Sequence, residues 1–292
     1  PLSSTYAFAL HGGAGAIAGR DYTVVEEHMQ ALTGECNARL GGGATALDVV
    51  EYAVIELESS GLYVAGRGSA PNSAGYVELD ASIMDGTSRE AGAVAAIVGV
   101  INPISAARRV MEATSHVMLA GHGATSFARE QGLPMVEDPD DYYVLPVGVY
   151  EHEITEQKHG TVGAVARDAS GGLAAATSTG GTFAKLEGRV GDSPLIGPGT
   201  WADDDVAISF TGTGEHIIRS GGAISIAHKI NAGAKPADAV AEVLDEIKRL
   251  GGDAGVIVVT RDGHIEMEYN SQGMKRASVR SGETVRTATF RT

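Results

Sequence analysis

The sequence predicts an α+β protein in which antiparallel hairpins pack against amphipathic helices. Small and β-branched residues on both sides of an Ala-Ser-Gly-Gly turn predict a hairpin over 161–179. Apolar runs on both sides of Asp262-Gly263 predict a second hairpin over 254–269, because this dipeptide is a strong turn signal. Apolar residues recur at helical spacing over 22–39 and over 45–61, and they predict two amphipathic helices.

The first part of the chain adds a strand and a Gly-rich loop to these helices. Residues 6–10 are predicted to form a strand that leads directly into His11-Gly12-Gly13-Ala14-Gly15. This loop is not GxGxxG and no Walker lysine follows it, so we predict close backbone packing rather than phosphate binding. Asp21 and Thr45 suit the cap positions of the two helices.

The rest of the chain alternates strands and helices. Pro103 suits the first turn of a helix, and we expect Arg108 and Arg109 on the solvated face of that helix. The glycines of 211–214 lie at the start of a helix over 215–231, where free N–H groups point outward. The role of the C-terminal tail, residues 277–292, stays open. The other predicted elements are strands at 76–84, 91–100, 116–119 and 206–210, and helices at 123–131 and 236–250.

The register of the first hairpin places two threonines side by side. A three-residue loop at 169–171, with Gly171 in a left-handed conformation, pairs residues whose numbers sum to 340. Thr161 then faces Thr179, and a two-residue loop would still leave the two adjacent. The first residue of one strand therefore has a second hydroxyl beside it.

Thr161 can act as a nucleophile only if the bond between Gly160 and Thr161 is cut. Cutting frees an α-amine with a pKa of roughly 7.7–8.0, which takes the hydroxyl proton near neutral pH. Gly160 fits this step, because glycine permits backbone geometries in which the hydroxyl reaches the preceding carbonyl. From the hairpin pattern alone, a buried hairpin without chemistry is the commoner explanation.

Six short motifs follow one another in an order and at spacings that resemble one enzyme family. They are His11-Gly12-Gly13-Ala14-Gly15, Glu78-Leu79-Asp80-Ala81-Ser82-Ile83-Met84-Asp85-Gly86, His159-Gly160-Thr161-Val162-Gly163, Ser178-Thr179-Gly180-Gly181, Gly188-Arg189-Val190-Gly191-Asp192-Ser193-Pro194 and Thr211-Gly212-Thr213-Gly214-Glu215. Together, they resemble the plant-type L-asparaginase / isoaspartyl aminopeptidase family of N-terminal nucleophile hydrolases. The resemblance covers nearly the whole chain, from about residue 6 to 275.

The resemblance implies a four-layer αββα sandwich, the Ntn-hydrolase fold, with two stacked and mostly antiparallel sheets flanked by helices. It also implies an α subunit over 1–160 and a β subunit over 161–292 that begins at the nucleophile. The two would form one intertwined domain, and two such αβ pairs would form a dimer. Acidic residues and prolines over 134–160 predict an exposed, flexible linker before the cut, with an ordinary surface insertion as the alternative.

The resemblance also implies the catalytic roles. Thr161, once N-terminal, would attack the β-carbonyl of an aspartyl group while its own amine takes and returns the proton. Thr179 would hydrogen-bond this nucleophile and orient it. The hydroxyl of Thr211 and the N–H of Gly212 would form the oxyanion hole.

A second group of residues is implied to bind the aspartyl half of the substrate. Arg189 suits the α-carboxylate, because its planar fork binds carboxylates through two hydrogen bonds. Asp192 suits the α-ammonium, helped by Gly214 and by the backbone at Gly212. Outside this context, an arginine and an aspartate at this spacing more often form a surface ion pair.

The leaving group decides between two related activities. Ammonia as the leaving group gives L-asparaginase activity, and an amino acid gives isoaspartyl dipeptidase activity. We predict mainly β-aspartyl dipeptide hydrolysis with L-asparagine hydrolysis as a related activity, and a predominant L-asparaginase is the alternative. Residues 182–185 are expected near the leaving group, and β-Asp-Arg or β-Asp-Lys would be cationic candidates.

The loop over 61–75 resembles the family loop that binds a sodium ion through backbone carbonyls. Val64 stands where the family typically has an asparagine, so one polar group near the substrate is missing. Catalysis needs no cofactor in this scheme. The carbonyls expected to hold a structural sodium ion belong to Leu62, Tyr63, Val64, Ala65 and Arg67.

Three other classes of protein are alternatives to this assignment. Glycosylasparaginases typically have Thr-Gly-Asn-Gly where this chain has Thr-Gly-Thr-Gly at 211–214, which argues against that relative. The histidines show no metal-ligand spacing and HExxH is absent, which argues against a metal-dependent amidase. An uncleaved, non-catalytic binding protein of the same fold remains the alternative from another class.

Composition excludes several partners. The formal net charge of −15 over 292 residues argues against nucleic acid or an anionic membrane as partner. No apolar segment reaches the length of a membrane span, and no signal-peptide pattern is visible, so we expect a cytoplasmic protein. Cys36 is the only cysteine, which excludes an internal disulfide, and its helical context predicts a small, buried apolar role.

Overall fold

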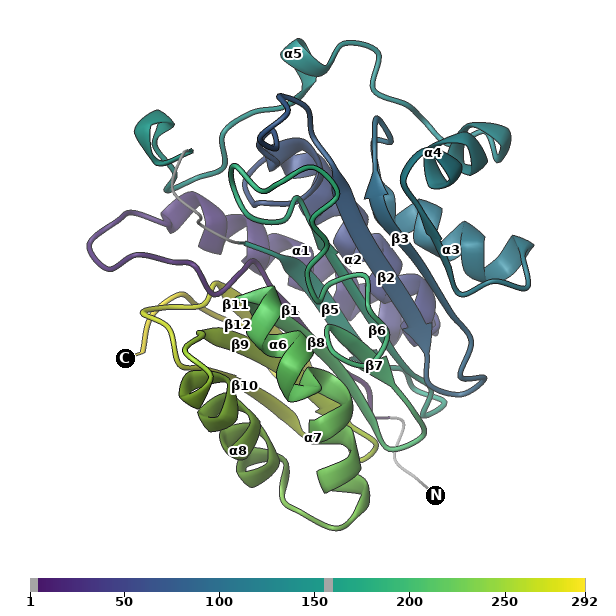
Figure 1. Cartoon of the computed structure of the whole chain (residues 1–292). Coiled ribbons are helices and arrows are strands. Elements are labelled where there is room, and N and C mark those ends of the chain that lie inside the picture. Colours follow the sequence, from purple (N-terminus) through teal and green to yellow (C-terminus); the bar gives the residue numbers. More distant parts are fainter. Residues whose placement is uncertain (1–4, 155–159, 292) are drawn as a thin grey trace.

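The computed structural model describes residues 5–154 and 160–291, and it has four layers (Figure 1). Two β-sheets are stacked face to face, with apolar side chains between them. Helices cover the outer face of each sheet. The four-layer αββα sandwich predicted above is therefore confirmed.

The larger sheet has the strand order β12-β11-β1-β5-β6-β2-β3-β4, and the smaller sheet has the order β10-β9-β8-β7. Within the described residues, every named strand pair is antiparallel except β3 with β4, as predicted for mostly antiparallel sheets. The strands are β1 (Ala7–His11), β2 (Leu79–Asp85), β3 (Ala91–Ile97), β4 (Met118–Ala120), β5 (Val162–Arg167), β6 (Leu173–Thr179), β7 (Thr200–Ala202), β8 (Val206–Gly212), β9 (Ala254–Thr260), β10 (Ile265–Tyr269), β11 (Arg276–Arg280) and β12 (Arg286–Ala288).

Helices α1 to α4 pack on the larger sheet, and α6 to α8 pack on the smaller one (Figure 1). Thr45 caps α2 as predicted, because its hydroxyl accepts a hydrogen bond from the N–H of Asp48 at 3.2 Å. The helical elements are α1 (Thr23–Gly41), α2 (Ala46–Ser60), η1 (Gly66–Gly68), α3 (Pro103–Ala113), α4 (Gly121–Glu130), α5 (Pro139–Tyr142), η2 (Glu151–Glu153), α6 (Gly214–Ser220), α7 (Gly222–Asn231) and α8 (Pro236–Arg249).

Strand alternation divides the apolar residues into three buried layers. In β9, Val256 and Val258 point to the helices of the smaller sheet, whereas Ile257 and Val259 point to the larger sheet. Most of the contact layer between the sheets consists of small or β-branched residues, which lets the sheets approach closely. Burial of apolar surface in all three layers holds the four layers together.

Two predicted elements differ in the structure. The helix expected over 215–231 is two helices, because Gly221 adopts φ 75° and turns the chain between α6 and α7. The tail, whose role stayed open, forms β11 and β12 at one edge of the larger sheet. Strand β11 pairs directly with β1, so the end of the chain closes the sheet beside the start of the chain.

The acidic linker is only partly exposed. Residues 155–159, which include Glu156 and His159 of the predicted linker and cleavage motif, lie outside the described residues. Most of 134–152 is exposed or half-buried. Glu153, however, is buried and forms a two-pronged ion pair with Arg20, at 2.5 and 2.8 Å. The predicted exposed linker is therefore anchored to the preceding part of the chain at Glu153.

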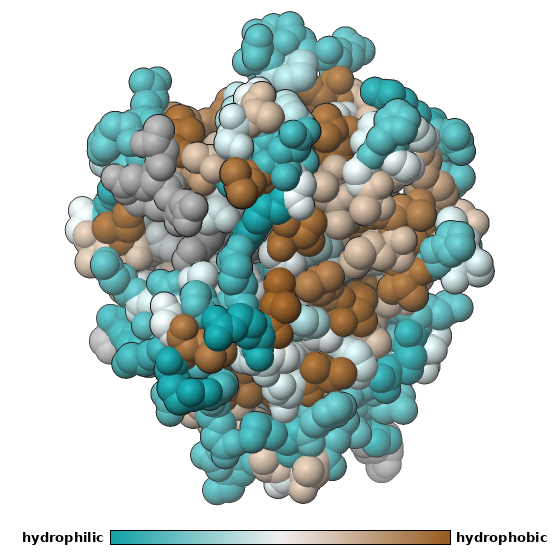
Figure 2. Space-filling model, in the orientation of Figure 1, coloured by the Kyte–Doolittle hydropathy of each residue, from teal (hydrophilic) through white to brown (hydrophobic). Residues whose placement is uncertain are grey.

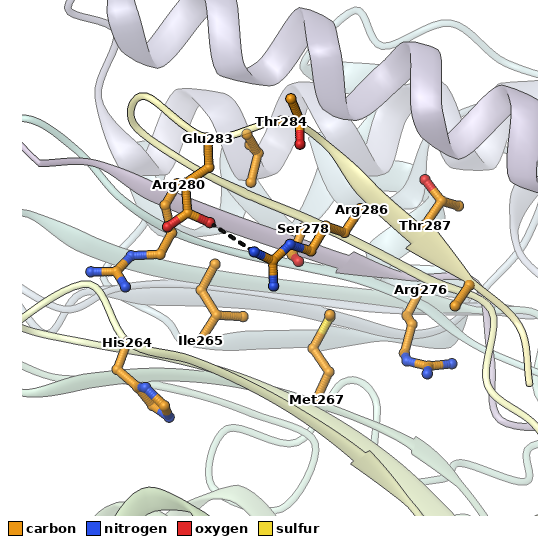
Figure 3. A pocket seen from close by; sticks show the side chains of 12 residues that line it. His264, Ile265, Met267, Arg276, Ser278, Arg280, Glu283, Thr284, Arg286 and Thr287 are labelled. Carbon is orange, nitrogen blue, oxygen red and sulfur yellow. Dashed lines mark ion pairs between the residues drawn. The ribbon is translucent and has the colours of Figure 1, made fainter. Parts of the chain in front are cut away.

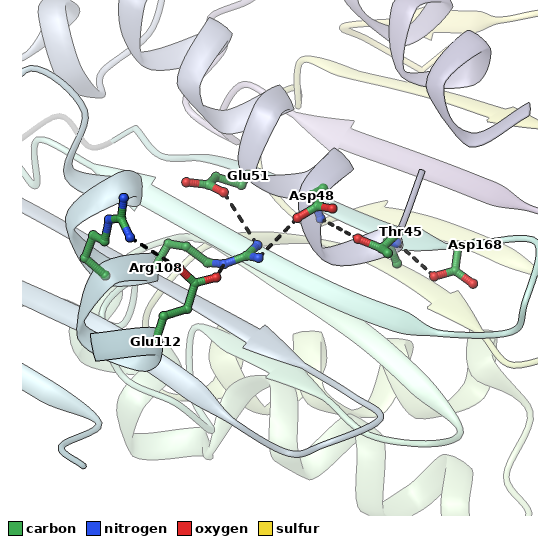
Figure 4. A network of polar contacts seen from close by, with 8 residues as sticks. Thr45, Asp48, Glu51, Arg108, Glu112 and Asp168 are labelled. Atoms are coloured by element: carbon green, nitrogen blue, oxygen red, sulfur yellow. Dashed lines mark hydrogen bonds and ion pairs between the residues drawn. The ribbon is translucent and has the colours of Figure 1, made fainter. Parts of the chain in front are cut away.

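Arg108 is also less exposed than predicted. Its side chain is 15 % exposed and lies between α2 and α3, where it pairs with Asp48 at 3.1 Å and with Glu51 at 3.5 Å (Figure 4). Glu112 on the next turn of α3 completes the cluster. Arg109 is half exposed, in agreement with the prediction. The charge of Arg108 thus joins two helices instead of facing solvent alone.

The surface is mixed in polarity, and the single cysteine is buried as predicted. On the face seen in Figure 2, hydrophilic residues cover most of the rim and apolar residues gather near the centre. Across the described ranges, no helix is both long enough and apolar enough to cross a membrane. Cys36 is fully buried in α1, and burial raises the pKa of its thiol to about 12.

Candidate active site

The hairpin of β5 and β6 brings Thr161 and Thr179 together. Val162 pairs with Ser178 and Arg167 with Leu173, which is the predicted register, and Gly171 takes the predicted left-handed conformation. The two threonine hydroxyls lie 3.3 Å apart, and both residues are buried. The sequence prediction of adjacent hydroxyls is therefore confirmed.

Both hydroxyls converge on the carbonyl oxygen of Gly160. The Oγ1 of Thr161 donates to this oxygen at 2.7 Å, and the Oγ1 of Thr179 donates to it at 2.6 Å. Thr179 in turn accepts a hydrogen bond from the N–H of Gly181 at 2.9 Å, which fixes its side chain. The peptide bond expected to break thus has a hydroxyl nucleophile and a second hydrogen-bond donor at its carbonyl.

A steric contact explains the need for glycine at position 160. A Cβ at this position would lie 2.7 Å from both Cβ and Cγ2 of Val64, which is closer than atoms can pack. Val64 is itself buried and packs with Ala70 and Phe183. The residue that replaces the family asparagine therefore forms the wall against the cleavage site.

The carbonyls expected to hold sodium are already engaged. The oxygens of Leu62, Val64 and Arg67 accept from N–H groups of other segments, at 3.0 to 3.2 Å. The oxygens of Tyr63 and Ala65 accept from N–H groups within the same loop, at 2.8 and 3.1 Å. A carbonyl oxygen has two lone pairs, so each retains one, and the donor set still fits a hard cation that binds oxygen.

The Gly-rich loop joins Thr161 to Thr211. Gly13 lies against the backbone of Thr161, because a Cβ on it would lie 3.3 Å from the Thr161 oxygen and 3.4 Å from its nitrogen. The next residue, Ala14, donates its N–H to the hydroxyl of Thr211 at 3.2 Å. Thr211 and Gly212 end strand β8. The predicted nucleophile and one predicted oxyanion donor, Thr211, therefore contact consecutive residues of one loop.

The predicted carboxylate-binding residue, Arg189, has a partner that the sequence did not reveal. Its Nε and Nη2 each bond an oxygen of Glu215 at 2.8 Å. Burial works against the charge of Arg189, yet this ion pair raises its pKa, and the same pair lowers the pKa of Glu215. The edge formed by Nη1 and Nη2 stays available for a second carboxylate.

Asp192 and Gly214 lie together, as the predicted binding group requires. Asp192 is buried, and a Cβ on Gly214 would lie 3.0 Å from both the nitrogen and the Oδ1 of Asp192. Asp192 also contributes an attractive charge toward Arg189. The structure therefore brings Arg189, Asp192 and the start of α6 into one cluster.

Glu78 forms hydrogen bonds that fix the loop carrying Arg189. Both carboxylate oxygens of Glu78 accept from the N–H of Gly188, at 3.0 and 3.1 Å. The carbonyl of Glu78 accepts from the ammonium of Lys185 at 2.9 Å. Lys185 is buried, and burial lowers its pKa although Asp80 and Glu78 partly offset this effect. Lys185 thus bonds the residue whose carboxylate holds the loop.

A separate groove of about 490 Å³ lies between β10 and the β11–β12 pair (Figure 3). Arg276, Arg280 and Arg286 line it over an apolar floor that includes Ile265 and Met267. None of the predicted catalytic or substrate-binding residues belongs to it, so we do not assign the reaction to this groove. In the described residues, no group of three or more His, Cys, Asp and Glu side chains could hold a metal ion.

Comparison with known proteins agrees with this arrangement. A family model described as asparaginase matches residues 4–144 and 140–289. The isoaspartyl peptidase of Salmonella typhimurium is 43 % identical over 97 % of this chain and 98 % of its own length. The isoaspartyl peptidase of Escherichia coli is 40 % identical over 97 % of this chain and 95 % of its own, and the isoaspartyl peptidase/L-asparaginase of Xenopus laevis is 39 % identical over 94 % and 92 %. The chain therefore belongs to the asparaginase family of these hydrolases.

Proposed function

We propose that this protein is an autoprocessing hydrolase that cleaves β-aspartyl (isoaspartyl) dipeptides and, as a related activity, the side-chain amide of L-asparagine. The observation that carries the proposal is the convergence of the Thr161 and Thr179 hydroxyls on the carbonyl of Gly160. The names of the relatives, isoaspartyl peptidase and isoaspartyl peptidase/L-asparaginase, support the substrate class.

Maturation would proceed at the bond between Gly160 and Thr161. The Oγ1 of Thr161 attacks the Gly160 carbonyl carbon, and the hydrogen bond from Thr179 stabilises the charge on the carbonyl oxygen. The C–N bond then breaks, and the nitrogen of Thr161 takes the proton that the hydroxyl has lost. Water hydrolyses the resulting ester and leaves a carboxylate on Gly160 and a free amine on Thr161.

In turnover, the free amine of Thr161 takes the proton of its own hydroxyl, which attacks the β-carbonyl of the substrate. Thr179 orients the nucleophile. The Thr211 hydroxyl already accepts from Ala14, so its own hydrogen is available to donate to the oxyanion together with the N–H of Gly212. The leaving amine takes the proton back, and water then releases aspartate by the same steps.

The α-carboxylate of the substrate would bind the open edge of Arg189, while Glu215 holds the other edge. The α-ammonium would bind Asp192 and the carbonyl of Gly214. This clamp specifies the aspartyl half and leaves the leaving group loosely specified, which allows a dipeptide or L-asparagine to react. Loss of the family asparagine at Val64 would favour the dipeptide by making the wall near the cleaved bond apolar.

We also propose that fragments 1–160 and 161–292 stay together as one intertwined domain after cleavage. Strand β1 from the first fragment lies between β5 and β11 from the second, so separation would open two ladders. A dimer of such αβ pairs and a structural sodium ion in the 62–67 loop complete the proposal. Size-exclusion mass measurement tests the dimer, and melting temperatures in matched sodium and choline chloride test the ion.

A mass spectrum of purified protein, followed by rates on β-Asp-Leu, β-Asp-Arg and L-asparagine, tests the function directly. We expect fragments split after Gly160 and faster cleavage of the dipeptides. Faster hydrolysis of L-asparagine would make this mainly an L-asparaginase. An intact chain without turnover would identify the uncleaved binding protein and reject the proposed function.

A further inference from the structure

A continuous chain of buried polar side chains runs between the two sheets. Nε2 of His11 lies 2.9 Å from the hydroxyl of Ser209, which lies 2.7 Å from that of Thr177. The Thr177 hydroxyl lies 2.6 Å from that of Thr200, which lies 2.7 Å from that of Ser82. All five residues are 0 % exposed. We call this set, His11–Ser209–Thr177–Thr200–Ser82, the interlayer chain.

The two ends of the interlayer chain reach the two halves of the proposed site. At one end, Nδ1 of His11 lies 3.2 Å from the carbonyl oxygen of Thr161. At the other end, the hydroxyl of Ser82 donates to the carbonyl oxygen of Ser193 at 2.6 Å. Ser193 directly follows Asp192, the proposed ligand of the α-ammonium. One end therefore contacts the backbone of the nucleophile, and the other contacts the residue that follows the substrate clamp residue Asp192.

The two backbone carbonyls at the ends of the interlayer chain determine the direction of its hydrogen bonds. A carbonyl only accepts, so Nδ1 of His11 must carry a hydrogen toward Thr161, and a neutral ring then accepts at Nε2 from Ser209. Ser209 in turn accepts from Thr177. Thr200 donates to Thr177, and the hydrogen of Ser82 is shared between the hydroxyl of Thr200 and the carbonyl oxygen of Ser193. Six contacts thus share five hydrogens, and both ends donate outward.

The surrounding backbone is shaped to hold this chain. A Cβ on Gly163 would overlap the Ser209 hydroxyl and would come within 2.5 Å of Nε2 of His11. Gly163 is the second residue of β5, so the strand that directly follows Thr161 lies against the interlayer chain. The members come from β1, β2, β6, β7 and β8, which belong to both sheets.

We propose that the interlayer chain is a positioning device that holds the backbone of Thr161 in register with the substrate clamp at Asp192 and Ser193. This inference rests on the proposed function for the identity of the clamp. Buried hydrogen bonds of this kind are costly to break, because no water is present to replace the lost partner. A shift of the Thr161 backbone is therefore opposed by the hydrogen bonds at the Ser193 end, and a shift of Ser193 is opposed by those at the Thr161 end.

Kinetics of matched variants separate the two ends. Ser209→Ala removes the donor to His11, and we expect roughly 10-fold slower maturation and lower kcat with little change in KM. Ser82→Ala removes the donor to Ser193, and we expect KM to rise roughly 10-fold with little change in kcat. Ser209→Thr and Ser82→Thr keep the hydroxyl and should restore much of each loss. Thr200→Val, which orphans no donor, should have the smallest effect of the three deletions.

The control is Ser225→Ala, which removes a serine hydroxyl bonded to Ser220 within the outer helix layer and should leave kcat and KM unchanged. The double variant Ser209→Ala/Ser82→Ala tests the connection itself. We expect its loss in kcat/KM to differ from the product of the single losses, because the two ends share one chain. Strictly multiplicative effects, or equal losses in kcat and KM at both ends, would overturn the proposal.

A measurement that needs no turnover distinguishes failure of this inference from failure of the proposed function. In ¹⁵N-histidine-labelled protein, the His11 ring should be neutral with its hydrogen on Nδ1, and Ser209→Ala should shift its Nε2 signal. A hydrogen on Nε2 instead would break the chain and reject the inference. The parent protein could instead show the expected tautomer but no hydrolase activity. That result would reject both the proposed function and the coupling, and the interlayer chain would then have only a structural role.

Discussion

The hydroxyl of Thr179 donates to the carbonyl oxygen of Gly160 at 2.6 Å, on the carbonyl that the neighbouring hydroxyl of Thr161 also contacts. The two donors therefore share one acceptor before any cut is made. In the uncut chain, Thr179 is placed to stabilise negative charge on that oxygen. After a cut, the same hydroxyl would remain beside the nucleophile, at 3.3 Å.

Replacing Thr179 by valine should slow maturation strongly. The variant keeps the shape of the side chain but removes the donor to Gly160, and loss of one such donor typically costs about 100- to 1000-fold. The time course of fragment appearance on a denaturing gel measures this. Thr179→Ser, which keeps the hydroxyl, is the control and should mature far faster than the valine variant. Equal rates for the valine variant and the parent would show that Thr179 has no part in the cut.

Replacing Gly160 by alanine should also block maturation, for a steric reason. The new Cβ would lie 2.7 Å from two atoms of Val64, so the peptide would have to move away from the hydroxyls. The double variant Gly160→Ala/Val64→Ala removes one of these atoms and should recover part of the cleavage rate. Val64→Ala alone is the control for the cavity. If the double variant matures no faster than Gly160→Ala, contact with Val64 is not the reason for glycine.

Replacing Thr161 by alanine should abolish both the cut and hydrolysis, because one hydroxyl serves as nucleophile in both steps. Thr161→Ser keeps a hydroxyl and should retain both at reduced rates. Mass spectrometry and release of aspartate from β-Asp-Leu measure the two steps. Turnover by Thr161→Ala above the background of an empty preparation would refute the assignment.

The Arg189–Glu215 pair should affect substrate binding more than chemistry. Arg189→Lys loses the planar fork, so we expect KM to rise roughly 10-fold or more with a smaller change in kcat. Glu215→Gln leaves one edge of Arg189 without its anchor and should raise KM by a smaller factor. Arg249→Lys is the matched control, because Arg249 forms a similar two-pronged pair with Glu246 on the exposed side of α8. Unchanged KM in Arg189→Lys would remove Arg189 from the clamp.

The contribution of His11 to the free energy of unfolding should fall in mild acid. Burial lowers the pKa of His11 to about 3, although the hydrogen bond to Thr161 opposes this shift. Between this value and its ordinary pKa of 6.5, the unfolded chain binds a proton that the folded chain excludes, so folding stability declines as pH falls. From pH 6.5 to 5, the expected contribution is on the order of 2 kcal/mol.

Urea unfolding of the parent and of His11→Gln at pH 6.5 and at pH 5 measures this contribution. It is the difference between the two proteins in how much the free energy of unfolding changes with pH. Buried Glu58 must be kept in both proteins, because burial raises its pKa from 4.5 to about 8 and gives the opposite pH dependence over this whole interval, so only the difference between the two proteins reports His11. His122→Gln, at an exposed histidine, is the matched control and should change little. An equal acid response in the parent and in His11→Gln would place the acid sensitivity elsewhere.

Much of the site followed from local patterns because those patterns act over short distances. The turn at 169–171 determines the register of β5 and β6, and this register alone places Thr161 beside Thr179. Alternation of apolar residues predicted most strands and helices, since each must bury one face. A glycine in a left-handed conformation divides the helix expected over 215–231, and the Gly221-Gly222 pair is a local turn signal that helical periodicity does not register.

The contacts of several residues could not be derived in this way, although they stood inside the motifs. Glu215 pairs with Arg189 across 26 positions, and Glu78 supports Gly188 across 110. His11 reaches Ser209 across 198 positions. Only packing of two sheets and two helix layers brings such residues within 3 Å of each other. Sequence spacing holds no information on such distances.

The sequence by itself determined the class of fold, the hairpin with its two threonines, and the family to which the chain belongs. Tertiary structure decided why residue 160 is glycine, which carboxylate holds Arg189, and how the nucleophile connects to the clamp. The physical reason is that hydrogen-bond register and apolar periodicity are local properties. Exclusion of a side chain by Val64 and burial of a hydroxyl chain exist only when distant segments are packed together.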